Sequence, residues 1–159
     1  PPLRSALSLI QREAPRTSLS LLENHCSLEI ARPDGDNSGY DVIVEANGIV
    51  RHIQIKASII GGKTANQKVH LKLTEKPSAC VLWIYFNEET MQLGPYLYFG
   101  AAEPGKPMES LASRKVAKHT KGNKEGFKAE RESLRVLPKG AFCKLSSVEK
   151  VYEQLFGVA

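Results

Sequence analysis

Apolar and polar residues alternate with a period of two through the middle of the chain, which is the pattern of half-buried strands. The segments with this character, or with a short continuous apolar run, are residues 27–32, 40–46, 49–58, 69–73, 79–86 and 95–100. Asn47-Gly48 separates the second segment from the third, and both residues tolerate the positive φ angles of a two-residue type I′ turn. The sequence therefore predicts a β-hairpin over residues 40–58.

Helical spacing of apolar residues marks both ends of the chain. Short helices are predicted around residues 3–10 and 19–22, and a C-terminal helix carries apolar residues at i, i+3, i+4 and i+7. Ser146 and Glu149 form a capping box before that last helix, and Gly157 is placed to end it. The combined pattern predicts an α+β fold with a mixed, largely antiparallel central sheet flanked by helices.

The composition is that of one ordinary globular domain. With 159 residues, of which 42% are apolar and 25% are charged, the chain is long enough to bury a core, and we expect residues 1–159 to form a single domain. The longest apolar run, residues 79–86, is far shorter than the roughly 20 residues that span a bilayer, so no membrane partner is expected. Three widely spaced cysteines without a C-x-x-C pair fit a reducing cytoplasm.

The net charge of +5 is concentrated in the second half of the chain. Residues 1–60 hold 6 Lys and Arg against 7 Asp and Glu, which leaves a charge of +6 for residues 61–159. Such a basic stretch suits a polyanion, although a solvated surface has the same composition. The candidate nucleic-acid contacts are Lys63, Arg114, Lys115, Lys118 and Lys121.

The predicted hairpin brings polar residues together on one face. In a two-residue hairpin Ala46 pairs with Ile49, so residues whose numbers sum to 95 lie opposite one another, and Asp41 faces Gln54. Lys56 then lies diagonally from Asp41, within about 7–8 Å. This polar face is either solvated or part of a site, and a solvated face is the commoner explanation of such alternation.

Two segments of the hairpin together form a motif. They are Gly39-Tyr40-Asp41-Val42-Ile43-Val44 and Ile53-Gln54-Ile55-Lys56-Ala57. The pair resembles the core motif of the PD-(D/E)xK nuclease superfamily, in a variant with Gln for the usual acidic residue that is similar to type IV restriction endonuclease catalytic domains. The likeness covers roughly residues 17–100 and implies an α/β/α restriction-endonuclease-like core, with residues 101–159 as a basic extension that ends in the terminal helix.

The resemblance implies a site that hydrolyses phosphodiesters with Mg²⁺ or Mn²⁺. The metal ligands would be Asp41, Gln54 and the main-chain carbonyl of Ile55, with Glu23 of the leading helix as a further catalytic carboxylate. An amide in place of a carboxylate removes one negative charge, so metal affinity should be lower than in other members. Lys56 would orient or activate the attacking water and stabilise the charge that develops on the phosphodiester. The expected substrate is nucleic acid, with DNA favoured, and the family is compatible with a homodimer.

Other polar and aromatic residues have simpler interpretations. His52 and Ser58 continue the polar face of the hairpin, and a lone His is more often structural than functional. Six aromatic residues lie in two apolar segments, where core packing is favoured over base stacking. They are Trp83, Tyr85, Phe86, Tyr96, Tyr98 and Phe99.

A second motif overlaps the first. Residues 57–64 read A-x-x-x-x-G-K-T, which is close to a phosphate-binding loop. Such a loop leads into a helix, whereas residues 69–73 alternate with the period of a strand, so residues 61–64 are predicted to form a surface loop instead.

Three functions stay open. The first is a metal-dependent endonuclease, in restriction or another defence system. The second is a nucleic-acid-binding module that keeps the nuclease fold without efficient chemistry. The third is a protein-interaction domain whose polar face is solvated. The leading-helix carboxylate is a further open choice, with Glu13 as the alternative to Glu23.

Overall fold

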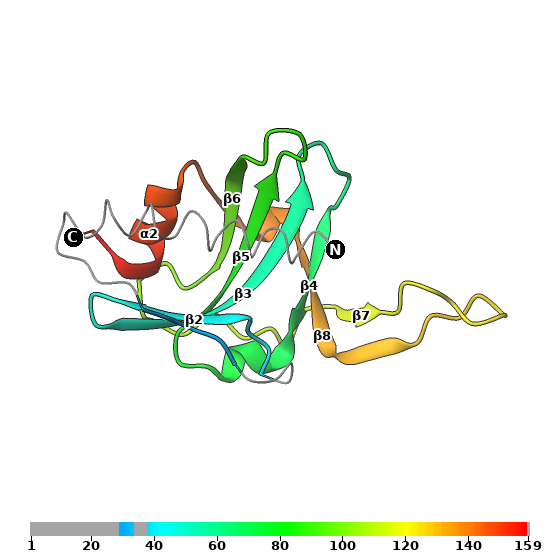
Figure 1. Ribbon diagram of the computed structural model, residues 1–159. Coiled ribbons are helices and arrows are strands. Elements are labelled where there is room, and N and C mark those ends of the chain that lie inside the picture. Colours follow the sequence, from blue (N-terminus) through cyan, green and yellow to red (C-terminus); the bar gives the residue numbers. More distant parts are fainter. Residues whose placement is uncertain (1–28, 34–37, 159) are drawn as a thin grey trace.

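The computed structural model describes residues 29–33 and 38–158, which form two β-sheets and one α-helix (Figure 1). The larger sheet contains β1 (Glu29–Ala31), β2 (Val42–Ala46), β3 (Ile49–Ile59), β5 (Ala79–Phe86), β6 (Leu93–Gly100) and β9 (Cys143–Leu145). The smaller sheet contains β4 (Asn66–His70), β7 (Val116–Lys118) and β8 (Glu130–Pro138). The helix is α2 (Val148–Phe156), and the 3₁₀ helices are η1 (Leu71–Glu75) and η2 (Lys139–Ala141).

The larger sheet is mixed, as expected. Its strands lie in the order β1-β2-β3-β5-β6-β9, and each neighbouring pair is antiparallel except β3 and β5, which are parallel. Parallel neighbours need a crossover connection, so the chain leaves this sheet after β3, forms β4 and η1, and returns as β5. The crossover places β4 and η1 over one face of β3.

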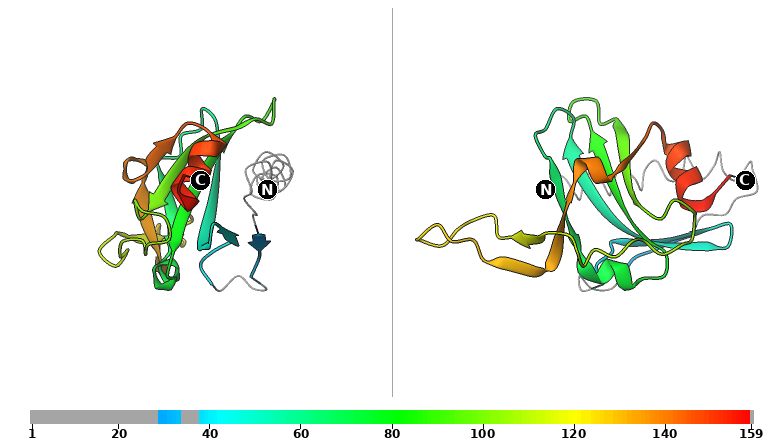
Figure 2. Two further views of the ribbon diagram at one scale, coloured as in Figure 1. Left: turned by 90° about the vertical axis from the view of Figure 1, so that its left-hand side faces the viewer. Right: turned by 180° about the vertical axis from the view of Figure 1, so that it is seen from behind.

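The layer over that face differs from the prediction of flanking helices. In the described part of the chain it is an antiparallel sheet in the order β4-β8-β7, while α2 covers the opposite face (Figure 2). Val69 of β4 and Leu137 of β8 pack with Val81 and Trp83 of β5. Strands replace helices here because residues 66–70 find a partner in β8, far along the chain. The helices predicted around residues 3–10 and 19–22 lie outside the described residues.

The β2–β3 hairpin is confirmed together with its register. Paired residues, from Val42 with Ile53 down to the turn, have numbers that sum to 95. Asn47 has a φ angle of 53° and Gly48 a φ angle of 72°, which are the positive values that the two-residue turn requires. Local turn chemistry therefore determines which residues of β2 and β3 face each other.

The strand predicted over residues 69–73 lies earlier in the chain. Pairing with β8 ends at His70, and the chain then turns into η1. His70 caps this 3₁₀ helix, because its Nδ1 atom accepts a hydrogen bond from the N–H of Lys72 at 3.2 Å. Leu73 is fully buried in this 3₁₀ helix, so it belongs to the core as predicted although it does not lie in a strand.

Helix α2 begins as its capping pattern predicts, but one residue later. Ser147, rather than Ser146, is the N-cap, and its Oγ atom accepts a hydrogen bond from the N–H of Lys150 at 3.3 Å. Gly157 ends the helix with a φ angle of 83°. No helix among the described residues is long and apolar enough to cross a membrane.

The aromatic residues of β5 and β6 are core residues, as expected. Each exposes 8% of its surface or less, and Trp83 exposes none. The set comprises Trp83, Tyr85, Phe86, Tyr96, Tyr98 and Phe99. Tyr96 and Tyr98 pack on one face of the larger sheet, and Trp83, Tyr85 and Phe99 pack on the other.

Candidate functional site

Asp41 lies where β2 leaves the ladder that it forms with β3. Its N–H donates to the carbonyl of Ile53 at 2.9 Å, and its Oδ2 atom accepts a hydrogen bond from the N–H of Ile55 at 2.6 Å. In a continued ladder the N–H of Ile55 would donate to the carbonyl of Tyr40, so the carboxylate replaces a main-chain acceptor. The expected pairing of Asp41 opposite Gln54 is therefore wrong, because the Asp side chain competes with the backbone at this point.

Gly39 brings the segment before β2 close to η1. Its φ angle is 78°, and a Cβ atom at this position would lie 3.1 Å from the nitrogen of Leu73 and 3.3 Å from Cβ of His70. Both the positive φ angle and the close approach favour glycine. The glycine thus lets the chain enter β2 with Asp41 beside the corner between β4 and η1.

The main chain of Ile55 faces the same edge of β3 as the Asp41 carboxylate. Along a strand, successive residues direct their N–H and C=O groups to alternate neighbouring strands. The N–H of His52 bonds to Ser78 on the β5 side, and the C=O of Ile53 bonds to Asp41 on the β2 side. The carbonyl of Ile55 therefore points to the β2 side, where the ladder has ended and the carboxylate lies.

Gln54 and Lys56 lie on the face of β3 that β4 and η1 cover. The Oε1 atom of Gln54 accepts a hydrogen bond from the N–H of His70 at 3.2 Å. Burial lowers the pKa of Lys56, and the negative charge of Asp41 acts in the opposite direction. Burial and then Lys72 lower the pKa of His70, and Lys56 adds to this effect. Asp41, Gln54, Lys56 and His70 thus form one half-buried group, called the hairpin cluster below.

His70 is the member of the hairpin cluster that the sequence does not reveal. It lies 16 residues beyond Gln54 and reaches it through the crossover that pairs β4 with β8. The local pattern around His70 predicts only a strand, and no motif connects it to β3. Its place in the cluster depends on long-range pairing alone.

His52 and Ser58 lie on the same face of β3 as Gln54 and Lys56, and each contacts a residue of the fold. The His52 ring packs edge-to-face against Tyr40 with 5.0 Å between ring centroids, and burial followed by the charge of Lys76 lowers its pKa. The Oγ atom of Ser58 accepts a hydrogen bond from the indole N–H of Trp83 at 2.9 Å. These contacts favour packing roles for both residues.

The donor atoms of the hairpin cluster suit a hard divalent cation, although they are few. Within residues 29–33 and 38–158, no three His, Cys, Asp or Glu side chains gather into a metal-holding group. Asp41 and Gln54 accept the main-chain hydrogen bonds described above, and each oxygen of a carboxylate or amide side chain carries two lone pairs. Mg²⁺ commonly takes one or two carboxylates and completes its shell with water and substrate phosphate. Asp41, Gln54 and the Ile55 carbonyl therefore fit a cation that binds with its substrate, and Glu23 lies outside the described residues.

Most of the predicted nucleic-acid contacts are exposed. Lys63 lies in the turn between β3 and β4, and the chain continues from this turn as a strand. The prediction that residues 61–64 form a surface loop is therefore confirmed. Lys115 directly precedes β7, Lys118 is its last residue, and Lys121 lies further along the β7–β8 hairpin, which extends away from the two-sheet body (Figure 1). The basic positions therefore belong to two separate surface segments.

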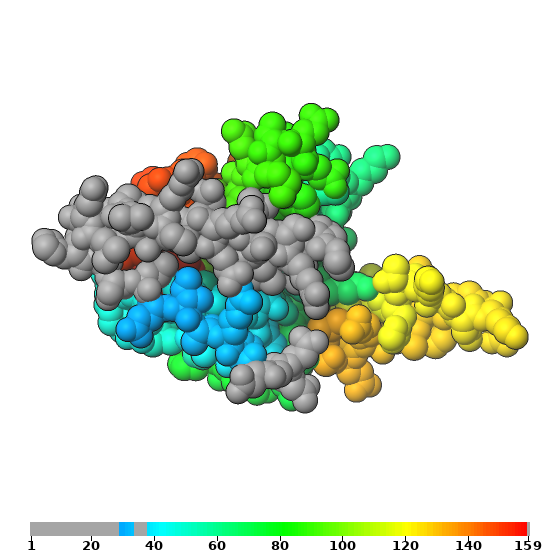
Figure 3. All heavy atoms as spheres, viewed as in Figure 1, coloured from blue at the N-terminus to red at the C-terminus, as the bar shows by residue number. Residues whose placement is uncertain are grey.

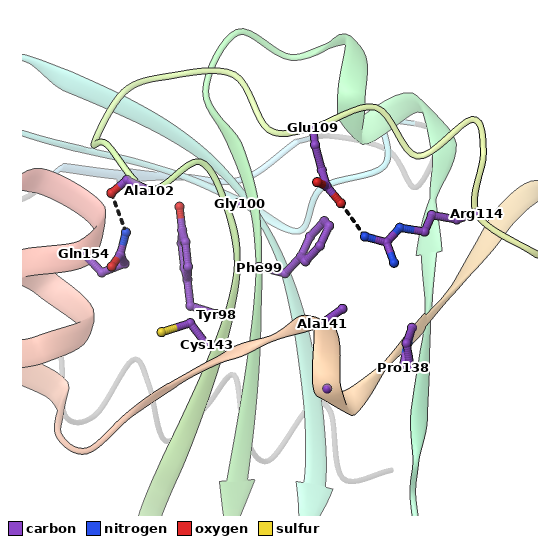
Figure 4. A pocket seen from close by; sticks show the side chains of 11 residues that line it. Tyr98, Phe99, Gly100, Ala102, Glu109, Arg114, Pro138, Ala141, Cys143 and Gln154 are labelled. Carbon is purple, nitrogen blue, oxygen red and sulfur yellow. Dashed lines mark hydrogen bonds and ion pairs between the residues drawn. The ribbon is translucent and has the colours of Figure 1, made fainter.

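Arg114, the remaining predicted contact, lines a cavity of about 570 Å³ beside β6 and α2 (Figure 4). Its guanidinium forms an ion pair with Glu109 at 2.5 Å and lies over the ring of Phe99 at 5.8 Å. Across the cavity, the side-chain amide of Gln154 donates to the carbonyl of Ala102 at 3.0 Å. No member of the hairpin cluster lines this cavity, and these polar side chains already pair, so we place the candidate chemistry at the hairpin cluster.

A scan of the chain against protein-family models matches no family, and a search of curated proteins finds no match. The function is therefore argued from the geometry of the hairpin cluster itself.

Proposed function

We propose that this protein is a divalent-metal-dependent nuclease that hydrolyses nucleic-acid phosphodiester bonds, with DNA as the favoured substrate. The observation that carries the proposal is the meeting of the Asp41 carboxylate with the Ile55 main chain at the edge of β3, next to Gln54 and Lys56. Hydrolysis of a phosphodiester needs a cation at the phosphate and a group that handles the attacking water, and this edge offers candidates for both.

The proposed core is of the restriction-endonuclease type. Its support is the β2–β3 hairpin followed by β5, which lies parallel to β3. The crossover between those strands uses β4 and η1, where the resemblance implies a helix. A role in restriction or another defence system, a homodimer and a cytoplasmic location are parts of the same proposal.

Asp41, Gln54 and the carbonyl of Ile55 would hold Mg²⁺ or Mn²⁺ in this proposal. The bound cation would polarise the scissile phosphate and lower the pKa of a bound water. The hydrogen bond from the Ile55 N–H keeps one Asp41 oxygen in place, so the carboxylate is oriented by the sheet rather than by a flexible side chain. Such orientation lowers the entropy lost when substrate binds.

Lys56 would stabilise the negative charge that develops on the phosphodiester in the transition state. Its side chain is half-buried, so the ammonium is partly desolvated, and a cation with fewer waters interacts more strongly with an anion. Burial also lowers the pKa of Lys56, which brings its Nζ atom closer to the condition in which it accepts a proton from water. His70 would keep Gln54 in position through its main-chain N–H.

Cleavage assays on plasmid, linear duplex and single-stranded DNA in Mg²⁺, Mn²⁺ or EDTA test the proposal. Asp41→Asn and Lys56→Met should each abolish metal-dependent cutting, whereas the exposed control variants Glu88→Gln and Lys144→Met should retain it. Cutting that survives in EDTA, or in either hairpin-cluster variant, would place the activity elsewhere.

A nucleic-acid-binding module without efficient chemistry is the second candidate. The observation that favours it is the hydrogen bond between Gln54 and the His70 N–H, because it gives the amide a structural role and leaves Asp41 to supply the charge of the proposed metal site. This candidate predicts binding to DNA without turnover in any metal. Replacing Gln54 by Glu distinguishes the two, since restoring the carboxylate should strengthen metal binding and increase cutting only in a nuclease.

A further inference from the structure

A basic hairpin extends from the body of the molecule between β7 and β8. Residues 117–131, called the arm below, stand out from the two sheets in the ribbon and space-filling views (Figures 1 and 3). Five residues of the arm are Lys or Arg and two are Glu, which gives the arm a net charge of +3. All arm residues except Ala117 are exposed, so these charges face solvent and can meet a polyanion.

The direction of the arm is built into its base. Val116 pairs with Arg135 but the next residue, Ala117, pairs with Arg131, so three residues of β8 bulge out between the two pairs. A bulge bends the strand that carries it. The Arg135 guanidinium donates to the carbonyls of two of these three residues at 2.6 Å and 3.3 Å, and Lys68 of β4 donates to the carbonyl of Lys118 at 2.9 Å. The arm therefore projects at an angle that side-chain contacts hold.

The tip of the arm presents one aromatic ring. Asn123 and Phe127 close the turn with a main-chain hydrogen bond of 2.8 Å, and the Oδ1 atom of Asn123 accepts further bonds from Glu125 at 3.0 Å and Phe127 at 2.8 Å. Gly122 permits the tight closure, because a Cβ atom there would lie 2.9 Å from the main chain of Gly126. The turn holds Phe127 with 67% of its surface exposed.

We infer that the arm holds single-stranded nucleic acid, with its lysines on the phosphates and the Phe127 ring stacked on a base. The inference rests on the proposed function, which names nucleic acid as the substrate. It adds that the substrate is nucleic acid with accessible bases. Basic residues supply affinity that falls with salt, and an aromatic ring adds stacking that paired bases inside a duplex do not offer. An exposed ring among lysines matches both requirements, because phosphates and bases alternate along a single strand.

Fluorescence anisotropy in EDTA tests the stacking contact. A labelled single strand and the matching duplex are titrated with wild type, Phe127→Ala and Phe127→Trp. Phe127→Ala should weaken single-strand binding roughly 5- to 150-fold and duplex binding much less, while Phe127→Trp should bind as well as wild type or better. Met91→Ala, which removes another exposed apolar side chain at the β5–β6 turn, should change neither affinity. Equal single-strand affinity of Phe127→Ala and wild type would overturn the inference, and so would the absence of binding at low salt.

The salt dependence tests the lysines separately. For single strands, the slope of log affinity against log salt changes by about 0.7 for each phosphate contact, so Lys121→Met with Lys124→Met should reduce it by about 1.4. The control variant Lys144→Met on β9 should leave the slope unchanged. An unchanged slope in the double variant would show that these arm lysines do not contact the phosphates. If Phe127→Ala weakens binding to anionic phospholipid vesicles but not to DNA, the arm binds membrane surfaces instead. EDTA makes these results independent of cleavage, so a protein that binds through the arm but never cuts DNA would refute only the proposed nuclease.

Discussion

The carboxylate of Asp41 accepts a hydrogen bond from the main-chain N–H of Ile55 at 2.6 Å, and this bond ties the entry of β2 to the strand that carries Lys56. Because the acceptor is charged and replaces a ladder bond, Asp41→Ala should lower the free energy of unfolding by about 1–3 kcal/mol. Asp41→Asn keeps an acceptor oxygen and should lose less. Urea denaturation of both variants measures the difference, and an unchanged midpoint for Asp41→Ala would show that the bond does not stabilise the fold.

The charge of Lys56 should lower the free energy of unfolding of the protein. Burial lowers its pKa, so in the folded state the charged form is disfavoured, and stability increases as the pH rises toward 10.5, the ordinary pKa that the unfolded chain retains. At neutral pH, Lys56→Met should therefore raise the free energy of unfolding by about 0.5–2 kcal/mol while cleavage is lost. Lys144→Met is exposed and should change stability by less than about 0.5 kcal/mol. A less stable Lys56→Met would mean that attraction to Asp41 outweighs burial.

We expect the two histidines near the hairpin to make the fold less stable in mild acid. Burial is the main cause that lowers the pKa of His52 and His70 below 6.5, so the unfolded chain takes up protons first as the pH falls. Their contribution is complete above the unfolded pKa and is lost as the pH falls through the folded values. His52→Phe keeps the packing on Tyr40 and His70→Asn keeps an acceptor for Lys72, so the double variant should flatten the decline of stability between about pH 7 and 5. The control variant His119→Gln changes an exposed residue of the arm and should leave the decline of stability unchanged. If the double variant also left this decline unchanged, His52 and His70 would not be its cause.

The parts of the fold that follow from the sequence are those that neighbouring residues determine. Asn47-Gly48 fixes the turn and therefore the register of β2 against β3, and Ser147 with Gly157 bounds α2 to within a residue of the pattern. The smaller sheet does not follow, because Asn66 pairs with Pro138, which lies far along the chain, and neither segment indicates its partner.

The candidate site follows from the sequence only in part. Hairpin register brings Gln54 and Lys56 to one face, as expected, but the ladder ends before Asp41 because its side chain takes the place of a main-chain acceptor. Alternation cannot reveal such competition between side chain and backbone. His70 enters through the crossover, and the tip residue Phe127 sits in a stretch whose composition indicates only basic charge.

Two cysteines should differ in reactivity by their surroundings. Burial raises the pKa of the Cys80 thiol to about 11, and the side chain is fully buried, whereas Cys143 is exposed. Since the thiolate is the reactive form, iodoacetamide should alkylate Cys143 in the native protein and Cys80 only when the fold opens. Peptide mass spectrometry over time measures both rates, with the urea-unfolded protein as the control in which the rates converge. Alkylation of Cys80 as fast as Cys143 under native conditions would mean that β5 is accessible.

Ser58 tests where the functional part of the β3 polar face ends. Its Oγ atom accepts the indole N–H of Trp83 at 2.9 Å in the core, so Ser58→Ala leaves that donor unsatisfied and should lower the free energy of unfolding by about 1–3 kcal/mol. Adding Trp83→Phe removes the unsatisfied group, so the double variant should be more stable than the sum of the two single changes predicts, as a double-mutant cycle in urea measures. At a temperature where Ser58→Ala remains folded, its DNA cleavage should equal that of the wild type. A folded Ser58→Ala that no longer cuts would extend the site along β3 beyond Lys56.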